Sequence, residues 1–359
     1  MQLAVLSDIH AHSSAFRKAV EYLKDRKDLK YCVLGDTINY GPDPAGCLQI
    51  LWDLDQCGVL LKNENDIPAV LGGNHEEAWL WCEAHFKQQL DAIQDMPEEK
   101  QIIELIKLAN GEVSSKYKHP SGSVMKEFAI QALLLTIMLL RKDTNQSLVA
   151  WYRALILQNG VGPLIINSDE TGDWKLILAH VSLEYPRTEE YIYPCHPDPG
   201  VASRYLKRYL LGNQKDEEHK TILLHGHTHI PLCQHVDSEK PASFDYNAIL
   251  RLHASLNLIN PGSIGQPRDG DYRPSLAVLN FDEGVLTTEF IRLDLDKKTR
   301  IQHLRDMEEK EFPSKLRAIA RGEGFVTPFP RTDCEKSLIL RAGRYKITSE
   351  DLYGGEVDE

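Results

Sequence analysis

Short apolar runs alternate with helical patterns along the first part of the chain. Apolar runs that predict strands lie at 3–6, 31–34, 68–71, 174–179 and 221–224. Between the first runs, apolar residues at helical spacing predict amphipathic helices over about 13–24 and 44–54. This alternation is typical of β-α-β units, so we expect an α/β layer architecture.

The pattern changes after about residue 248. Closely spaced runs that predict further strands lie at 250–253, 256–259, 275–279 and 287–293. Asn-Pro-Gly and Asp-Gly segments, which are typical of turns, separate these runs. We therefore expect a second, more antiparallel sheet in this part of the chain.

A helical pattern replaces the alternation between the third and fourth strands. Helices are predicted near 98–109, 124–141 and 147–158, and a charged helix near 297–320. We expect a core formed by 1–83 and 161–294, an all-helical insertion over 84–160, and a C-terminal helical extension and tail over 295–359. The insertion begins and ends near the strand ends, so we also expect it to act as a lid or cap that limits substrate size.

Five of the apolar runs end in residues that bind metals. These ends are Asp8-Ile9-His10, Gly35-Asp36, Gly73-Asn74-His75, Ala179-His180 and Gly226-His227-Thr228-His229. Open α/β sheets bind ligands beyond the carboxyl ends of their strands, so these segments are expected to meet at one edge. Residues two apart on an extended segment point to the same side, which pairs Asp8 with His10 and His227 with His229.

The donors at these ends comprise carboxylates, an amide oxygen and imidazoles. They are Asp8, Asp36, Asn74, His10, His180, His227 and His229. A mixed oxygen and nitrogen set without thiolate suits divalent ions such as Mn, Fe, Zn or Co. The set exceeds what one tetrahedral ion needs, and with one bridging carboxylate it would serve two ions.

Charge and composition narrow the class of partner. The 359 residues carry a formal net charge of −12, which disfavours a protein that binds nucleic acid or anionic lipid by charge alone. The seven cysteines are scattered without a Cys-x-x-Cys pair, and the N-terminal segment lacks the features of a signal peptide. The most apolar window, 128–140, is short for a membrane span. We therefore expect a cytoplasmic protein without a membrane partner.

The strand-end motifs also carry a family resemblance. Asp-x-His, Gly-Asp-x-x-x-Tyr-Gly-Pro-Asp-Pro, Gly-Asn-His-Glu, a lone His and Gly-His-Thr-His, in this order, resemble the calcineurin-like metallophosphoesterases. Together with the segment 260–271, they are most similar to the bacterial and archaeal branch of diadenosine tetraphosphatase-like or YfcE-like phosphodiesterases. The resemblance covers about 1–82 and 162–293, and it implies a four-layer α-β-β-α sandwich that carries the helical insertion.

The resemblance also implies how the donors are divided. One divalent ion would be held by Asp8, His10, Asp36 and His229. The second would be held by Asp36, Asn74, His180 and His227, which makes Asp36 the bridge. Manganese is the expected ion, with Fe, Zn, Ni, Co and Mg as alternatives. The implied catalytic residue is His75, which faces the substrate and either protonates the leaving oxygen or stabilises the transition state.

Three further residues are candidates for substrate contacts. His12 lies beside the metal motifs and is expected to reach a substrate phosphate, although it could equally cap the following helix. Arg268 and Arg273 could bind phosphate oxygens, or could form salt bridges within their own loop.

Together these features predict metal-dependent hydrolysis of phosphate esters, with in-line attack by a hydroxide that bridges the two ions. The expected substrates are nucleotides or other small phosphorylated molecules, cleaved by phosphodiesterase or phosphatase activity. Two divalent ions and two carboxylates give the site a charge of about +2, which attracts phosphate to an acidic protein. The alternatives are a nuclease acting on DNA or RNA, a serine/threonine protein phosphatase, and a scaffold without catalysis. The sequence leaves any protein partner unknown.

Overall fold

The structure is a computed structural model. It describes residues 1–113, 116, 127–167, 171, 174–181, 220–235, 242, 245–252, 256–269, 271–282, 285–296 and 298–299. The helix expected over 297–320 and nearly all of the 295–359 extension lie outside these residues, so those expectations stay predictions.

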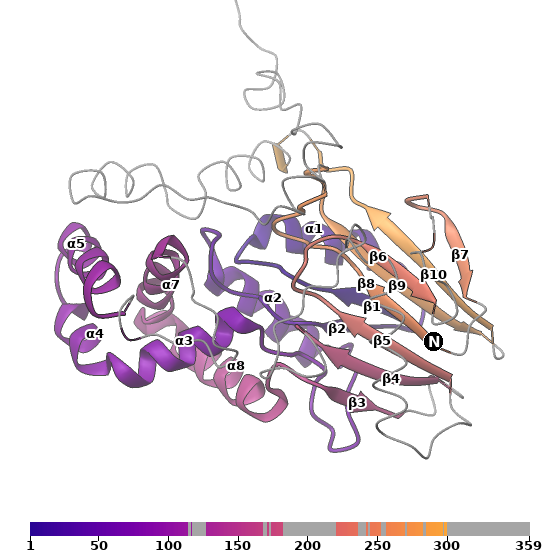
Figure 1. Cartoon of the computed structure of the whole chain (residues 1–359), viewed down its shortest axis with the longest axis horizontal. Coiled ribbons are helices and arrows are strands. Elements are labelled where there is room, and N and C mark those ends of the chain that lie inside the picture. The colour runs from indigo at the N-terminus through magenta and orange to yellow at the C-terminus, as the bar shows by residue number, and fades with distance from the viewer. Residues whose placement is uncertain are drawn as a thin grey trace, which may run out of the picture.

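The first sheet has the strand order β2-β1-β9-β10-β7 (Figure 1). Its strands are β1 (Gln2–Leu6), β2 (Leu29–Val33), β7 (Ile249–Leu252), β9 (Ser275–Asp282) and β10 (Val285–Arg292). β1 pairs with β2 in parallel, and its other edge pairs with β9 in antiparallel register. The remaining pairs, β9 with β10 and β10 with β7, are antiparallel, so the sheet is mixed.

The second sheet has the order β3-β4-β5-β8-β6. Its strands are β3 (Leu164–Ile166), β4 (Trp174–Ala179), β5 (Lys220–His225), β6 (Leu232–His235) and β8 (Leu256–Asn260). The three central strands are parallel, whereas β3 and β6 close the edges in antiparallel register. The carboxyl ends of β4 and β5 therefore lie at the same edge.

The expectation of a separate antiparallel sheet after residue 248 is wrong. β7, β9 and β10 extend the sheet that β1 begins, and β8 joins β5 in the other sheet. The periodicity of a strand reports its buried face but not its partner, and β1 offers a free edge to which β9 bonds from Gln2–Asn280 to Val5–Ala277. The run at 68–71 forms isolated bridges instead of a strand, and β3 and β6 were not predicted.

The apolar core follows the alternation of side chains along β1. Leu3 and Val5 belong to a buried cluster with residues of β4 and β5, such as Leu178 and Leu224, so the two sheets pack face to face. Ala4 and Leu6 point the other way, into a cluster with Phe16 and other residues of the helices. The described residues thus contain a helical layer and two sheets, which are three of the four layers of the expected α/β sandwich.

The described residues also form helices and short helical turns, which loops connect to the strands. They are α1 (Ser13–Leu23), α2 (Pro44–Gln56), α3 (Asn74–His85), α4 (Lys87–Gln94), α5 (Glu98–Leu108), a π-helical turn (Ala109–Val113), α7 (Glu127–Leu140), a 3-10 turn (Asp143–Asn145) and α8 (Gln146–Asn159). The side chain of Asp43 caps α2 by accepting a hydrogen bond from the Gly46 backbone, and Pro44 starts the helix.

The helices predicted within 84–160 are present: α5 and α7 lie away from the strands, and α8 runs back toward β3 (Figure 1). Their buried residues, such as Leu133 of α7 and Ile156 of α8, share one apolar cluster with α1 and α2. The boundaries of the insertion stay a prediction, but its helices pack directly on those of the core. None of the helices that the structure describes is long and apolar enough to cross a membrane.

Candidate metal centre

The expected metal donors lie close together at the ends of strands from both sheets. Asp8 and His10 follow β1, Asp36 follows β2, His180 follows β4, and His227 and His229 follow β5. Asn74 and His75 begin α3, because the run before them ends at Gly73 and the chain turns directly into a helix. The structure therefore brings together all seven residues expected to bind metal, and all seven are buried.

Five of these residues adopt a left-handed backbone conformation. Their φ angles are 52° at Asp8, 47° at His10, 51° at Asp36, 67° at His227 and 60° at His229. Such angles are uncommon outside glycine and cost free energy, and they persist where the surrounding structure fixes them. The neighbouring backbone does so here: the amide of His10 donates to the carbonyl of Asp36 at 2.8 Å, and the amide of Asp8 to that of Gly35 at 3.1 Å.

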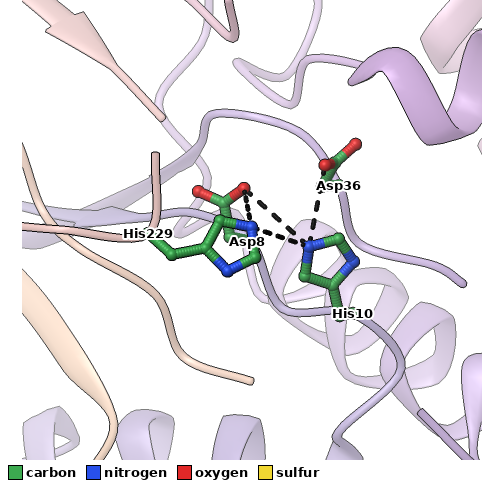
Figure 2. A group of neighbouring side chains, drawn as sticks. All are labelled: Asp8, His10, Asp36 and His229. Carbon is green, nitrogen blue, oxygen red and sulfur yellow. Dashed lines mark hydrogen bonds and ion pairs between the residues drawn. The ribbon is translucent and has the colours of Figure 1, made fainter. Parts of the chain in front are cut away.

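The first group comprises Asp8, His10, Asp36 and His229, whose ligand atoms lie within 4.8 Å of one another. Figure 2 shows these side chains pointing toward a common centre. Nε2 of His229 lies 3.2 Å from Oδ1 of Asp8 and 3.1 Å from Nε2 of His10. Nε2 of His10 lies 3.7 Å from Oδ2 of Asp36. Two imidazole nitrogens and two carboxylate oxygens thus converge, as in a divalent-ion site.

The second group comprises Asp36, His180 and His227. Nε2 of His180 lies 3.2 Å from Oδ2 of Asp36 and 3.2 Å from the side-chain oxygen of Asn74. The Asn74 oxygen therefore adjoins this group, as the resemblance implied. Asp36 is the residue common to both groups, and the same oxygen, Oδ2, faces His10 in one and His180 in the other.

Each carboxylate has one oxygen held by the protein, while its other oxygen faces the histidines. Oδ2 of Asp8 accepts hydrogen bonds from the Ser7 hydroxyl at 2.6 Å and from the His227 amide at 3.0 Å. Oδ1 of Asp36 accepts a hydrogen bond from the amide of His75 at 3.2 Å. These bonds orient Oδ1 of Asp8 and Oδ2 of Asp36 toward the imidazoles, so both carboxylates are positioned before any cation binds.

Backbone carbonyls orient two of the imidazoles in the same way. Nδ1 of His180 lies 2.7 Å from the carbonyl oxygen of Leu34, and Nδ1 of His229 lies 2.7 Å from that of Gln266. A carbonyl oxygen only accepts hydrogen bonds, so Nδ1 carries a proton in both rings. In the neutral ring Nε2 then has its lone pair available, which is the arrangement that metal-binding histidines use.

Burial and charge set the protonation of the site. Burial lowers the pKa of His10 and of His227 well below 6.5, so both are neutral near pH 7. Burial would raise the pKa of Asp36, but the adjacent His180 and His75 hold it well below its usual range. Burial opposes a charge on His180, yet Asp36 raises its pKa to about 9. A cation bound by Nε2 of His180 would therefore displace a proton from that ring.

Two glycines permit the close packing of the carboxylates. A Cβ atom at Gly73 would lie 2.0 Å from Oδ1 of Asp36, and one at Gly226 would lie 2.0 Å from the hydroxyl oxygen of Ser7. Side chains cannot approach so closely, which explains why the Gly-Asn-His and Gly-His-Thr-His motifs begin with glycine. The donor set, its orientation and this close packing all fit two divalent cations.

His75 lies beside the metal donors. Its Nε2 is 3.8 Å from Oδ2 of Asp36, and its ring packs edge-on against that of His10, with centroids 5.1 Å apart. Burial lowers the pKa of His75 to about 4, although Asp36 opposes the shift. The ring of Tyr40 contacts it from another side, with centroids 4.6 Å apart.

Sequence reasoning gave no role to Asn39, Tyr40 or Glu76, which surround His75. Glu76 is fully buried, and its carboxylate accepts hydrogen bonds from the backbone amides of 36–38 and of Gly73 and from the Tyr152 hydroxyl. Burial and then the charge of Asp36 raise the pKa of Glu76 to about 7. Two signals were available: Tyr40 and Glu76 stand within the motifs Gly-Asp-x-x-x-Tyr and Gly-Asn-His-Glu, and Asn39 lies three residues after Asp36.

The three candidates for substrate contact differ in their surroundings. His12 is buried at the start of α1, where its side chain makes no capping hydrogen bond. Arg268 lies close enough for its charge to lower the pKa of His10, His75 and His227. The guanidinium of Arg273 forms ion pairs with Asp271 at 2.7 Å and with Asp294 at 2.8 Å, which is the salt-bridged alternative for this residue.

Comparison with known proteins places the chain in a family. The family model described as calcineurin-like phosphoesterase matches residues 1–231. An uncharacterized protein of Methanocaldococcus jannaschii is 26% identical over 297 residues, which cover 82% of this chain and 88% of that protein.

Two solved structures are similar in fold. A metallophosphoesterase from Sphaerobacter thermophilus has a TM-score of 0.52 and 23% identity, over 90% of this chain and 99% of that chain. A hypothetical protein from Pyrococcus horikoshii has a TM-score of 0.51 and 17% identity, over 89% of this chain and 96% of that chain. Because the family model spans more than half of its residues, the protein belongs to the calcineurin-like phosphoesterases.

Proposed function

We propose that the protein is a hydrolase of phosphate esters that works with two divalent cations. The observation that carries this proposal is the position of Asp36, whose Oδ2 faces both groups of candidate ligands. Asp8, His10 and His229 would complete one site, and Asn74, His180 and His227 the other. Manganese is the ion we expect, with Fe, Zn, Ni, Co and Mg as alternatives that the same donors accept.

Two such cations lower the pKa of a bound water and neutralise charge on the attacking and leaving oxygens of a displacement at phosphorus. The residues of the chain hold the ligands in position for these cations. Ser7 and the His227 amide orient Asp8, and the His75 amide orients Asp36, so the ligands need little rearrangement. We assign to the His75 side chain, beside Asp36, the contact with a phosphoester oxygen in the transition state.

The burial of the site favours a small substrate. His75 is 5% exposed and Asn74 is 9% exposed. The other six candidate metal ligands are also buried. Two divalent ions and two carboxylates give a local charge of about +2, which attracts a phosphate despite the net charge of −12. We therefore propose nucleotides or other small phosphorylated molecules as substrates, cleaved as diesters or monoesters in the cytoplasm.

The test compares hydrolysis of a chromogenic phosphodiester and a chromogenic phosphomonoester with Mn, Ni, Mg or no added ion. Single-stranded DNA, RNA and a phosphopeptide serve as further substrates, so that nuclease or protein phosphatase activity would be detected. We expect turnover of at least one small ester that requires a divalent ion. Turnover of every substrate in the presence of chelator, or of none with any ion, would contradict the proposal.

Two variants separate the assigned roles. Asp36→Ala should lose bound metal and activity together, because both sites use its carboxylate. His75→Ala should keep its metal content and lose about 10²- to 10³-fold in kcat, the usual cost of removing one transition-state hydrogen-bond donor. His85→Ala makes the same change at an exposed position at the other end of α3 and should leave both quantities unchanged.

A further inference from the structure

The run 68–71, which leads into α3, uses both of its edges for hydrogen bonds. On one edge, the amide of Val33 in β2 donates to the carbonyl of Ala69 at 3.0 Å, and the amide of Leu71 donates to the carbonyl of Val33 at 2.8 Å. Neighbouring residues of an extended segment present their backbone groups to opposite edges. The carbonyls of residues 68 and 70 therefore belong to the other edge of the run.

The end of α8 occupies this other edge. Asn159, the last residue of α8, donates from Nδ2 to the carbonyl of Pro68 at 2.7 Å and to that of Val70 at 2.9 Å. A carbonyl oxygen only accepts, so the two contacts require the amide nitrogen and use both of its hydrogens. The amide of Gly72 donates to the carbonyl of Gly160 at 2.7 Å. One side chain and one backbone carbonyl thus take the place of a neighbouring strand.

Residues 159–162, at the end of α8 and before β3, form what we call the α8–β3 turn, and this turn also fixes the end of β4. The carbonyl of Val161 accepts a hydrogen bond from the amide of His180 at 2.9 Å. Gly162 lies so close to β4 that a Cβ atom on it would be 2.7 Å from the carbonyl oxygen of Leu178. The α8–β3 turn therefore contacts both the segment before α3 and the segment that ends in His180.

These contacts fix the spacing of two donors of the second group. Asn74 follows Gly72 by two residues, and its side-chain oxygen lies 3.2 Å from Nε2 of His180. Nε2 of His180 is in turn 3.2 Å from Oδ2 of Asp36. The amides of Gly72 and His180 bond to adjacent carbonyls of the α8–β3 turn, so a shift of the turn would move these donors relative to Asp36.

Other segments hold the first group. The hydroxyl of Ser263 donates to the carbonyl of Asp8 at 2.7 Å, and the carbonyl of Gln266 lies 2.7 Å from Nδ1 of His229. Among the residues that the structure describes, no hydrogen bond joins the α8–β3 turn to Asp8, His10 or His229. The turn thus supports one group of ligands and not the other.

We propose that Asn159 is a positioning residue for one of the two cations, and that it acts through the α8–β3 turn on Asn74 and His180. This inference rests on the proposed function, because it takes the second group as a cation site. Without the hydrogen bonds of Asn159, the second cation should bind about 10- to 100-fold more weakly, the usual cost of removing a group that orients metal ligands. The first cation should bind as before.

The first test removes each cation site in turn and needs no catalysis. His10→Ala keeps all ligands of the second group, and His180→Ala keeps all ligands of the first. Isothermal titration calorimetry measures zinc, an ion that suits both ligand sets, in each background with and without Asn159→Ala. We expect Asn159→Ala to weaken zinc about 10- to 100-fold in the His10→Ala background and by less than about 2-fold in the His180→Ala background. Equal losses in both backgrounds, or no loss in His10→Ala, would overturn the inference.

The second test keeps both sites, so it also decides the case in which a single-site variant binds no zinc. Zinc-loaded protein is equilibrated at a series of buffered free zinc concentrations, and native mass spectrometry counts the ions that stay bound. We expect Asn159→Ala to release one ion at a free zinc concentration about 10- to 100-fold higher than the wild type does, and the other ion at the wild-type concentration. An unchanged profile, or an equal shift for both ions, would refute the inference.

Two further variants test whether the hydrogen bonds of Asn159 cause the effect. Asn159→Ser keeps one possible donor, so it should lose less affinity, and it replaces Asn159→Ala if that protein does not fold. Asn145→Ala is the matched control, because Asn145 precedes the other end of α8 and its side-chain amide donates to the carbonyl of Leu139 at 3.1 Å. This control should bind both ions as the wild type does. A weaker second ion in Asn145→Ala would show that any loosening of α8 suffices, and would contradict the assignment to Asn159.

Hydrolysis assays separate this inference from the proposed function. In Asn159→Ala, the ion concentration for half-maximal turnover should rise about 10- to 100-fold, while kcat at saturating ion stays unchanged. A loss of kcat that saturating ion does not restore would contradict the inference, since it would place the role of Asn159 outside ion binding. A wild type that binds two ions and cleaves no ester contradicts the proposed function alone. Two ions that weaken equally in Asn159→Ala contradict the inference alone.

Discussion

Glu76→Gln is a change of one atom with a large expected effect on stability. Oε2 of Glu76 accepts hydrogen bonds from the amides of Asp36 at 3.0 Å and Gly73 at 2.7 Å. Oε1 accepts from the amides of Thr37 and Ile38 at 2.9 and 3.0 Å and from the Tyr152 hydroxyl. Glutamine replaces one of these oxygens with an NH₂ group, which cannot accept. Whichever way the amide turns, at least two buried backbone N–H groups lose their acceptor.

The expected loss of stability follows from the number of N–H groups that lose their acceptor. A buried donor without a partner costs about 1–3 kcal/mol, so two of them predict a loss of about 2–6 kcal/mol in the free energy of unfolding. This is a large part of the roughly 5–15 kcal/mol that stabilises a typical domain. Tyr152→Phe removes one hydroxyl donor and leaves every backbone N–H paired, so we expect a loss of only about 1 kcal/mol.

Urea unfolding of the metal-free proteins measures the difference without a contribution from bound ions. The assay is run at about pH 8, above the pKa of about 7 that burial gives Glu76, so that the wild-type carboxylate is charged. Glu64→Gln makes the same change at an exposed position and should stay within about 0.5 kcal/mol of wild type. If Glu76→Gln also stays within that range, the hydrogen-bond accounting is wrong.

The remaining predictions concern the site and its surroundings. His225 is buried, and burial lowers its pKa from 6.5 to about 4, so its contribution to stability is present above pH 6.5 and is lost as the pH falls through 4. Between about pH 7 and pH 5 this contribution to the free energy of unfolding falls by about 2 kcal/mol. Urea unfolding of the metal-free His225→Gln protein should therefore show a loss of stability over this pH range that is smaller than that of the wild type by about this amount. Gly73→Ala should displace the Asp36 carboxylate and lower the metal content measured by mass spectrometry, whereas Gly111→Ala, where a Cβ meets nothing within 4 Å, should not. Adding an ion at about 100 times its dissociation constant should stabilise the wild type by about 3 kcal/mol per site, and Asp36→Ala should lose this effect in thermal unfolding.

The sequence was informative where the place of a motif, at the end of an apolar run, predicts its place in the fold. The donors could be located because each follows an apolar run, and the carboxyl ends of parallel strands share an edge. Asp8 follows β1 and His180 follows β4, and both lie at the site as that rule requires. The mixed α/β class was predictable for the same reason, since alternating periods reveal strands and helices independently of their partners.

The sequence was less informative where contacts join distant segments. α3 was missed because half of its buried residues are polar (Asn74, His75 and Glu76), so the apolar residues alone give no clear stripe, and because its first residues read as the end of a strand. The pairing of β9 with β1 joins residues as far apart in the sequence as Gln2 and Asn280. Glu76 belongs to the Gly-Asn-His-Glu motif, but its role could not be predicted, because that role depends on the amides of 36–38 and no pattern in a single sequence records that contact.

The helical segment 84–160 illustrates how such contacts alter an interpretation. Taken as a lid, it should be removable with only a change in substrate range. In the structure the Tyr152 hydroxyl donates to Glu76 at 3.0 Å, and the Gly72 amide donates to the carbonyl of Gly160 at 2.7 Å. On the other side of His75, Asn39 faces the carbonyl of Ala129.

The segment therefore bonds to Gly72 and Glu76 through α8 and the residue that follows it, and to Asn39 through α7. Its deletion would leave these buried polar groups without partners and would expose the apolar cluster that Leu133 and Ile156 share with α1 and α2. Loss of activity after deletion would then say nothing about substrate size. Single changes such as Tyr152→Phe, which remove one bond and keep the packing, test instead whether the helices control the geometry of the catalytic loops.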